Sequence, residues 1–396
     1  MLAGCGSVVL SGTASTIGTQ LTIYSSLPLQ GPDSAISAQI VDGERLALAR
    51  VHGQIGQFHI SYYSMDDSNP KTGEIDPGAT AEDAKTAAED TSTIAYLGDY
   101  DSAATALSLP LVNAAGILQI SPASPYVGLT SSEDAGQDEP ERFYPTGKRT
   151  YGSLMPADPV AASAQVAMMR DLGVKKLYVL SDEDPFQVPL AELVAGDAQQ
   201  AGLEVLGKEQ LNTEHATSFS GAVEKIVASG AQAVFFSGAP SPGVIALFQE
   251  LYGANKHLRL FGSSALVNES FTTAVAAAAH KMLLGTPILP VRMYPTSAQR
   301  ILTQYRHQFG NTPHAYALYG YEVMSDALAA IAAAGAHGND RKTVVKEFFA
   351  IRNRDSVLGN YSIQPSGQST LDRYGFDRVR KGKPVFYRAL QASAAH

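Results

Sequence analysis

Cysteine and tryptophan are almost absent from this chain of 396 residues, which has one cysteine, Cys5, and no tryptophan. A single cysteine cannot form an internal disulfide, a cysteine-rich zinc site or an iron–sulfur cluster. Positive charge is also scarce, because 29 Lys and Arg stand against 38 Asp and Glu, a net charge of −9. This balance argues against a nucleic-acid-binding protein, which usually presents a basic surface. No run of about 18 apolar residues occurs, so the sequence predicts no membrane-spanning helix.

The signatures of enzyme chemistry are missing as well. The sequence has no H-E-x-x-H zinc motif, no G-x-S-x-G nucleophile elbow and no P-loop, and its nine histidines are not paired at metal-ligand spacing. We therefore expect no catalytic residues, no metal and no cofactor. Asp66 and Asp67 resemble an acid pair, but a capped turn at the end of a strand is the simpler interpretation.

Hydrophobic residues make up 45% of the chain, enough for two cores. From residue 20, short apolar runs alternate with longer amphipathic stretches. The first series predicts strands over 20–24, 58–63, 94–97 and 118–120 and helices over 37–50, 79–90 and from 102. A second series predicts helices over 159–172, 188–201, 219–229 and 244–251 and strands over 176–180, 203–207, 233–236 and 258–261. This alternation is typical of α/β units with parallel sheets.

Two segments depart from the alternation. Residues 130–151 are polar and rich in acids, which indicates a solvated surface insertion. The last part predicts helices over 296–309 and 316–334, then short strands and turns over 361–390. Helices followed by short strands are not expected to form a third hydrophobic core. We therefore expect these elements to add to the two earlier units, so that the chain crosses between the units several times.

Without catalytic motifs, two α/β units favour ligand binding. Open parallel sheets hold ligands at the carboxyl ends of their strands. The predicted strand ends are rich in Gly, Ser, Ala and Pro, and such small residues let the backbone approach a ligand. These strand ends are residues 98–102, 121–125, 181–186, 237–241 and 262–265. The helix N-termini at Ser102 and near Pro242 offer backbone N–H donors to an anion or a carbonyl.

Short motifs in a consistent order reinforce this interpretation. The most specific is the stretch from Gly116 to Ser124. The others are Leu27-Pro28-Leu29-Gln30-Gly31-Pro32, Asp42-Gly43 with Leu46-Ala47-Leu48-Ala49, Asp66-Asp67, Tyr96-Leu97-Gly98 with Ser102, Pro156-Ala157-Asp158, Thr217-Ser218-Phe219-Ser220 and Tyr319-Gly320-Tyr321-Glu322. Together they resemble the type I periplasmic solute-binding proteins of the branched-chain amino acid (leucine/isoleucine/valine) ABC-transporter family. The resemblance runs from about Gln20 to Leu390.

The resemblance implies two Rossmann-like lobes with parallel sheets, joined by a three-strand hinge that closes on a ligand. Carried over, it assigns residues 20–154 and 288–335 to lobe one, and 155–287 and 336–396 to lobe two. Residues 1–19 remain as a tether. The crossings are expected near Pro156, Pro287 and Ala336.

The resemblance also maps a ligand site. The serine that holds the ligand carboxylate matches Ser102, the backbone and hydroxyl site matches Ala123 and Ser124, and the closing aromatic matches Phe186. Pro125 follows and lacks the N–H of the family pattern. Ala239 stands at the position of a tyrosine, and Ser264 at that of the glutamate that pairs with the ligand ammonium. The expected ligand-binding set is Tyr100, Asp101, Ser102, Ala123, Ser124, Phe186, Ala239 and Ser264.

The missing glutamate leaves the ligand open: an amino acid, an aromatic acid or a related metabolite. Asp99 or Asp101 can supply the missing charge, or can simply cap the next helix. Tyr100, Tyr126 and Phe186 can stack a ring, or can only pack at the rim.

The N-terminus bears on location. Leu2-Ala3-Gly4-Cys5 resembles a lipobox, which implies a lipid on Cys5 and a site outside the cytoplasmic membrane, periplasmic or at the cell surface. The alternative is an ordinary N-terminus with a chance cysteine. Because no charged and apolar regions precede the motif, we expect the sequence to begin late within its signal peptide. The predicted function is a monomeric, lipid-anchored binding protein of an ABC importer that docks on a permease. A sensor of the same fold, or an enzyme on two α/β lobes, is the alternative.

Overall fold

The structure is a computed structural model that describes residues 16, 18–133 and 135–392. The chain divides into two compact units. Unit 1 holds the described residues of 1–125, 138–155 and 294–370, and unit 2 holds those of 126–137, 156–293 and 371–396. The expected α/β class with two mostly parallel sheets is confirmed.

The sheet of unit 1 has six strands in the order β2-β3-β1-β4-β5-β6. All neighbours are parallel except β2, which pairs antiparallel with β3. Leu21 and Ile23 are fully buried, as the alternation in this segment predicted. The strands are β1 (Gln20–Leu27), β2 (Gln54–Ile55), β3 (Phe58–Asp66), β4 (Thr93–Leu97), β5 (Leu118–Ser121) and β6 (Tyr151–Ser153).

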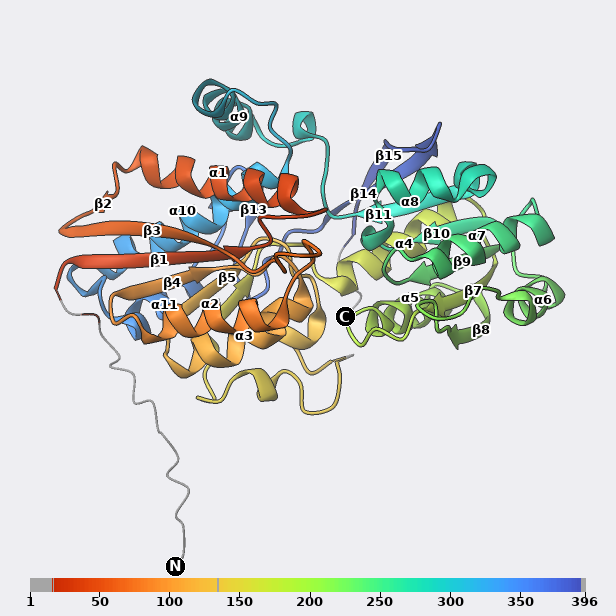
Figure 1. Cartoon of the computed structure of the whole chain (residues 1–396), viewed down its shortest axis with the longest axis horizontal. Coiled ribbons are helices and arrows are strands. Elements are labelled where there is room, and N and C mark those ends of the chain that lie inside the picture. The colour runs from red at the N-terminus through yellow and green to blue at the C-terminus, as the bar shows by residue number, and fades with distance from the viewer. Residues whose placement is uncertain (1–15, 17, 134, 393–396) are drawn as a thin grey trace, which may run out of the picture. The chain divides into compact units, whose positions relative to one another are not determined.

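Helices cover both faces of this sheet (Figure 1). α1 (Ser34–Arg50) and α10 (Tyr316–Ala334) lie on one face with α11 (Arg341–Phe349), and α2 (Pro77–Glu89) and α3 (Ser102–Ala114) lie on the other. α9 (Thr296–Phe309) also belongs to this unit.

Glycines allow α1 and α10 to touch backbone to backbone. A Cβ on Gly43 would lie 2.1 Å from the carbonyl oxygen of Ala317, and one on Gly320 would lie 2.1 Å from that of Ile40. Any larger residue must therefore separate the two helices.

The sheet of unit 2 has seven strands in the order β15-β14-β11-β10-β9-β7-β8. The five strands from β11 to β8 are parallel, whereas β14 and β15 are antiparallel and close one edge. The strands are β7 (Lys176–Ser181), β8 (Glu204–Gln210), β9 (Ala233–Ser237), β10 (Arg259–Gly262), β11 (Met282–Thr286), β14 (Arg373–Arg380) and β15 (Lys383–Gln391).

Alternate residues of these strands enter two separate cores. Phe235 packs in the core formed with α4 (Asp158–Asp171) and α5 (Val188–Gln200), whereas Phe236 packs in the core formed with α6 (Ser220–Ser229) and α7 (Pro242–Ala254). Because both faces are covered, β9 is apolar from Ala233 to Phe236, as buried parallel strands usually are.

Three expected assignments differ by more than one residue. The described residues of 126–137 and residues 288–293, expected in lobe one, belong to unit 2. Residues 336–370, expected in lobe two, belong to unit 1. Two arginines account for this placement. The buried guanidinium of Arg341 donates to the carbonyls of Thr93, Asp90 and Ala115, at 2.8 to 3.1 Å, and so ties α11 to the amino-terminal edge of the unit 1 sheet.

The second arginine lies in the hairpin β12 (Arg354–Asp355) and β13 (Asn360–Tyr361). Arg354 Nε lies 2.6 Å from Glu322 and 2.8 Å from Asp326, both on α10. The chain returns to unit 2 only after Thr370, where β14 joins β11.

Other expectations need smaller corrections. Cys5 lies outside the described residues. The expected tether extends too far, because Thr16 is 3% exposed and its N–H donates to the carbonyl of Asn339 at 2.8 Å. The segment 130–151 is not fully solvated, since Phe143 and Tyr144 are buried. Sequence reasoning also missed β2, β6, β11, β12, α11 and α8 (Glu269–Ala274).

Candidate functional site

In each sheet the strand order reverses at one point, and ligands of open α/β sheets bind there, outside the carboxyl ends of the strands. In unit 1 the reversal lies between β1 and β4. The chain passes from β1 to β3, which pairs with one side of β1, and then crosses to β4, which pairs with the other side. In unit 2 it lies between β7 and β9. Each unit therefore has its own candidate edge.

In unit 1 the loop after β4 carries three of the expected residues. Asp101 caps α3, since its Oδ1 accepts the N–H of Ala104 at 2.7 Å. Ser102 is the first residue of this helix and is 8% exposed. The ring of Tyr100 lies 6.3 Å from that of Tyr316, centre to centre. The loop begins at Gly98, where a Cβ would lie only 2.8 Å from the carbonyl oxygen of Ser26 on β1.

The loop after β5 lies beside the first. Ser121 Oγ donates to the carbonyl of Asp99 at 2.9 Å and accepts the N–H groups of Ala123 and Ser124 at 3.1 and 3.0 Å. The hydroxyl of Ser124 lies 2.8 Å from that of Thr105 on α3. The structure therefore brings Ala123 and Ser124 to the same edge as Ser102, but both amides are bonded to Ser121.

Asp99 is not available at the surface. It is fully buried, and its carboxylate accepts bonds from the hydroxyl of Tyr96 at 2.9 Å, the amide of Gln119 at 3.2 Å and the hydroxyl of Ser108. Burial raises the pKa of Asp99 to about 7. Of the two acids proposed as the ligand's counter-charge, the structure thus makes Asp99 part of the core and Asp101 a helix cap.

The acid pair at the end of β3 has two different environments. Asp66 Oδ1 accepts the N–H of Leu29 at 2.9 Å and that of Ser68 at 3.1 Å, so Asp66 holds the loop after β1, as a strand-end turn predicts. Asp67 is fully buried, and neither carboxylate oxygen has a hydrogen-bond partner among the described residues. Burial, followed by nearby carboxylates, raises the pKa of Asp67 to about 8.

In unit 2 the loop after β7 is organised by an acid that sequence reasoning missed. Asp182 Oδ2 accepts the N–H of Ala239 at 2.9 Å, and its Oδ1 accepts the N–H of Asp184 at 3.1 Å. Asp184 Oδ1 in turn accepts the N–H of Phe186 at 2.8 Å. Two expected ligand residues, Phe186 and Ala239, are therefore joined through two carboxylates. The Ser-Asp-Glu-Asp run at a strand end was the signal for this arrangement.

Aromatic contact also occurs at this edge. The ring of Phe186 meets that of Tyr126 edge to face, with centres 5.2 Å apart. Tyr126 is 3% exposed, which favours packing over ring stacking with a ligand. Ser264 begins a short 3-10 helix after β10 and is partly exposed, and the hydroxyl of Ser263 beside it is buried without a hydrogen-bond partner among the described residues.

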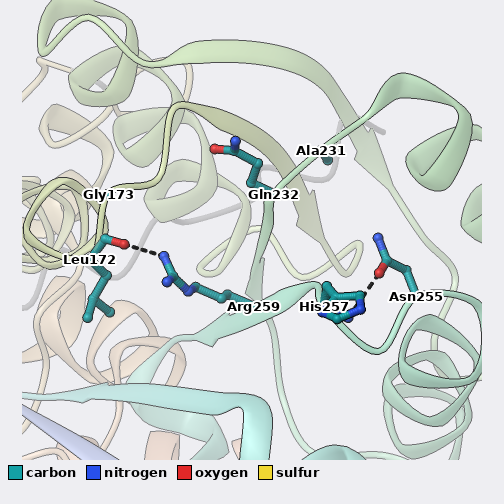
Figure 2. Close-up of a pocket in the computed structure, with 7 residues that line it drawn as sticks. All are labelled: Leu172, Gly173, Ala231, Gln232, Asn255, His257 and Arg259. Atoms are coloured by element: carbon teal, nitrogen blue, oxygen red, sulfur yellow. Dashed lines mark hydrogen bonds between the residues drawn. The ribbon is translucent and has the colours of Figure 1, made fainter.

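A recess of about 380 Å³ lies at the opposite, amino-terminal edge of the unit 2 sheet (Figure 2). Arg259 donates there to the carbonyl of Leu172, and the Oδ1 of Asn255 accepts the N–H of His257 at 2.9 Å. This recess is far from the carboxyl ends where α/β sheets bind ligands. Within the described part of the chain, no three His, Cys, Asp or Glu residues are grouped to hold a metal. No described helix is long and apolar enough to cross a bilayer.

Comparison with known proteins gives a consistent answer. A relative from Brucella suis biovar 1 (strain 1330), a Leu/Ile/Val-binding protein homolog 1, is 26% identical over 369 residues, which is 92% of each chain. A crystal structure of a leucine-binding protein from Thermotoga maritima has a TM-score of 0.75 at 17% identity, over 94% of this chain and 99% of that one. A solute-binding protein of an ABC transporter from R. palustris, in complex with benzoate, has a TM-score of 0.70 at 16% identity, over 95% and 98%. The family model described as periplasmic binding protein matches residues 21–383, and the chain therefore belongs to this family.

Proposed function

We propose that this protein is the solute-binding component of an ABC importer and works outside the cytoplasmic membrane. The observation that carries the proposal is the family match over residues 21–383, on a chain built from two doubly wound units. The relative from Brucella suis is named a Leu/Ile/Val-binding protein homolog. This supports a small, amino-acid-like solute.

The proposed ligand residues fall into two sets. Tyr100, Asp101, Ser102, Ala123 and Ser124 belong to the carboxyl edge of unit 1, and Phe186, Ala239 and Ser264 to that of unit 2. In the proposed mechanism the ligand first binds one set, where the start of α3 offers N–H groups to a carboxylate. Contact with the second set then closes the hinge, because the ligand binds the closed state more tightly.

The closed form then docks on a membrane permease, and the solute is released unchanged. In this proposal a lipid on Cys5 holds the protein at the membrane. The anchor has its own test: full-length protein should appear in the membrane fraction with a lipid mass on Cys5, and Cys5→Ser should release it. If the Cys5→Ser protein stays in the membrane fraction, Cys5 is not the anchor.

Ligand binding is tested by a thermal-shift screen of amino acids, amines and aromatic acids, followed by calorimetry. We expect at least one compound to bind with a Kd in the range of about 1 nM to 1 mM, with no turnover. Small-angle scattering with that compound should show a smaller radius of gyration, as hinge closure requires. A protein that binds no compound of these classes is not the receptor proposed.

A further inference from the structure

Asp67 is the most unusual polar residue of the carboxyl edge of unit 1. It is 0% exposed, and neither carboxylate oxygen has a hydrogen-bond partner among the described residues. Its own N–H donates to the carbonyl of Leu27 at 3.4 Å, so Asp67 lies beside the end of β1, next to the point of strand reversal. An unpaired buried carboxylate costs several kcal/mol, and buried polar groups without a partner are few in native proteins.

The charged groups that act most strongly on Asp67 are acidic. They come from three elements: Asp66 from β3, Asp83 from α2, and Asp99 and Asp101 from the loop before α3. Each of these charges acts against ionisation of Asp67. The loops at this edge, residues 28–33, 67–76, 98–101 and 122–125, contain a single Lys or Arg, Lys71, and its side chain is exposed.

We infer that the ligand is a cation of net positive charge, an amine or a cationic amino acid, and that its ammonium group binds at the carboxyl edge of unit 1 as the counter-charge that Asp67 lacks. The inference rests on the proposed function and narrows its ligand class. Asp101 is partly exposed at the start of α3. The buried carboxylate of Asp67 attracts the cation without direct contact, because charges in a poorly solvated interior interact over several ångströms. A ligand with negative charge alone would be repelled by the same groups.

The arrangement also couples binding to a proton. In the empty protein Asp67 is held in its neutral form, since burial and its acidic neighbours raise its pKa to about 8. An arriving ammonium group stabilises the carboxylate, so the O–H bond of Asp67 breaks and the proton passes to the buffer. Binding of a cation just below pH 8 should therefore release a proton, whereas a zwitterion such as leucine should release less, because its carboxylate opposes the effect of its ammonium group on Asp67.

The test is calorimetry on the full chain with L-lysine, putrescine, L-leucine and benzoate, in two buffers with different ionisation enthalpies. We expect lysine or putrescine to bind at least about tenfold more tightly than leucine, with a heat that depends on the buffer. Preference for lysine identifies a cationic amino acid, and preference for putrescine identifies an amine.

Asp67→Asn should remove most of the buffer dependence, leaving only what Asp99, with a pKa of about 7, contributes, and should weaken cation binding about tenfold. Glu89→Gln is the matched control, because it makes the same change from a carboxyl to an amide at the exposed last residue of α2, at the opposite edge of the sheet. Cation binding and proton release should be unchanged in this variant. If Asp67→Asn fails to fold, the pH dependence of proton release by the unaltered protein tests the role of Asp67. Release centred near pH 8 supports Asp67, and release centred near pH 7 assigns the proton to Asp99 instead.

Binding of leucine or benzoate without binding of either cation would overturn the inference and leave the proposed function standing. Cation binding with a heat independent of the buffer would overturn the role of Asp67. If no compound binds at all, the proposed function itself fails.

Discussion

The carboxylate of Asp182 accepts the backbone N–H of Ala239 at 2.9 Å, across the point where the strand order of unit 2 reverses. A second bond, from the N–H of Asp184, fixes the loop that carries Phe186. One buried acid thus sets the position of two proposed ligand residues from neighbouring strands.

Removing this acid should weaken ligand binding. Asp182→Asn keeps one acceptor oxygen, whereas Asp182→Ala loses both, so we expect affinity to fall about tenfold in the first and further in the second. Calorimetry with a ligand from the screen measures the effect. Glu183→Gln is the control, because this exposed neighbour makes the same change in charge without touching the two backbone bonds. Unchanged affinity in a folded Asp182→Ala protein would argue against this role.

The contact between α1 and α10 should tolerate no side chain at Gly320. We expect Gly320→Ala to lower the free energy of unfolding by about 1–3 kcal/mol, because the new Cβ overlaps the carbonyl of Ile40. The midpoint of urea unfolding reports the change. Gly196→Ala in α5, where a Cβ meets nothing within 4 Å, should instead stabilise the protein by about 0.5–1 kcal/mol. Equal effects of the two substitutions would contradict this account of the contact.

Stability should fall as the pH rises, and Asp158 should contribute to the fall. Burial raises the pKa of Asp158 to about 8 from its ordinary 3.8, so between these values the folded chain holds a proton that the unfolded chain has released. Unfolding is then favoured as the pH increases. The melting temperature should drop between about pH 5 and about pH 8, and drop less in Asp158→Asn.

Other buried acids also have a raised pKa. The dependence of the melting temperature on pH should therefore become weaker in Asp158→Asn without disappearing. Asp355→Asn, a change at an exposed position of β12, is the control and should keep the full slope. A slope that is the same in the two variants would mean that Asp158 is ionised in the folded protein.

The ion cluster of Arg354 should be essential for unit 1. Arg354→Met leaves Glu322 and Asp326 buried without their cation, a change that costs about 3–5 kcal/mol in buried pairs. Thermal unfolding measures the loss. Arg300→Met on the exposed face of α9 removes the same charge and should have little effect. A loss smaller than about 1 kcal/mol would place Arg354 among ordinary surface pairs.

The regular elements were predictable because their patterns are local. The apolar run of β9 and the helical spacing of α9 and α10 identified these elements, and the bounds predicted for α9 and α10 were correct. β6 was missed because three residues carry no periodicity, and β11 because its apolar run follows an alanine-rich helical stretch without a clear turn.

The candidate site was predictable only in part. Small residues at strand ends and the helix start at Ser102 identified the two edges. The sequence offered Asp99 and Asp101 as equal candidates, and only burial separated them. Asp182 passed unnoticed, because its role depends on the backbone of Ala239, 57 residues away.

The sequence by itself determined that the chain forms two α/β units whose strand ends are lined by small residues, since hydrophobic periodicity and turn residues act over a few neighbours. Tertiary structure decided that residues 336–370 join unit 1 and that the carboxylate of Asp67 has no hydrogen-bond partner among the described residues. Both depend on groups far apart along the chain, such as Arg341 with Thr93 and Asp67 with Asp99. Solvent exclusion and charge interact through space, and no local pattern records them.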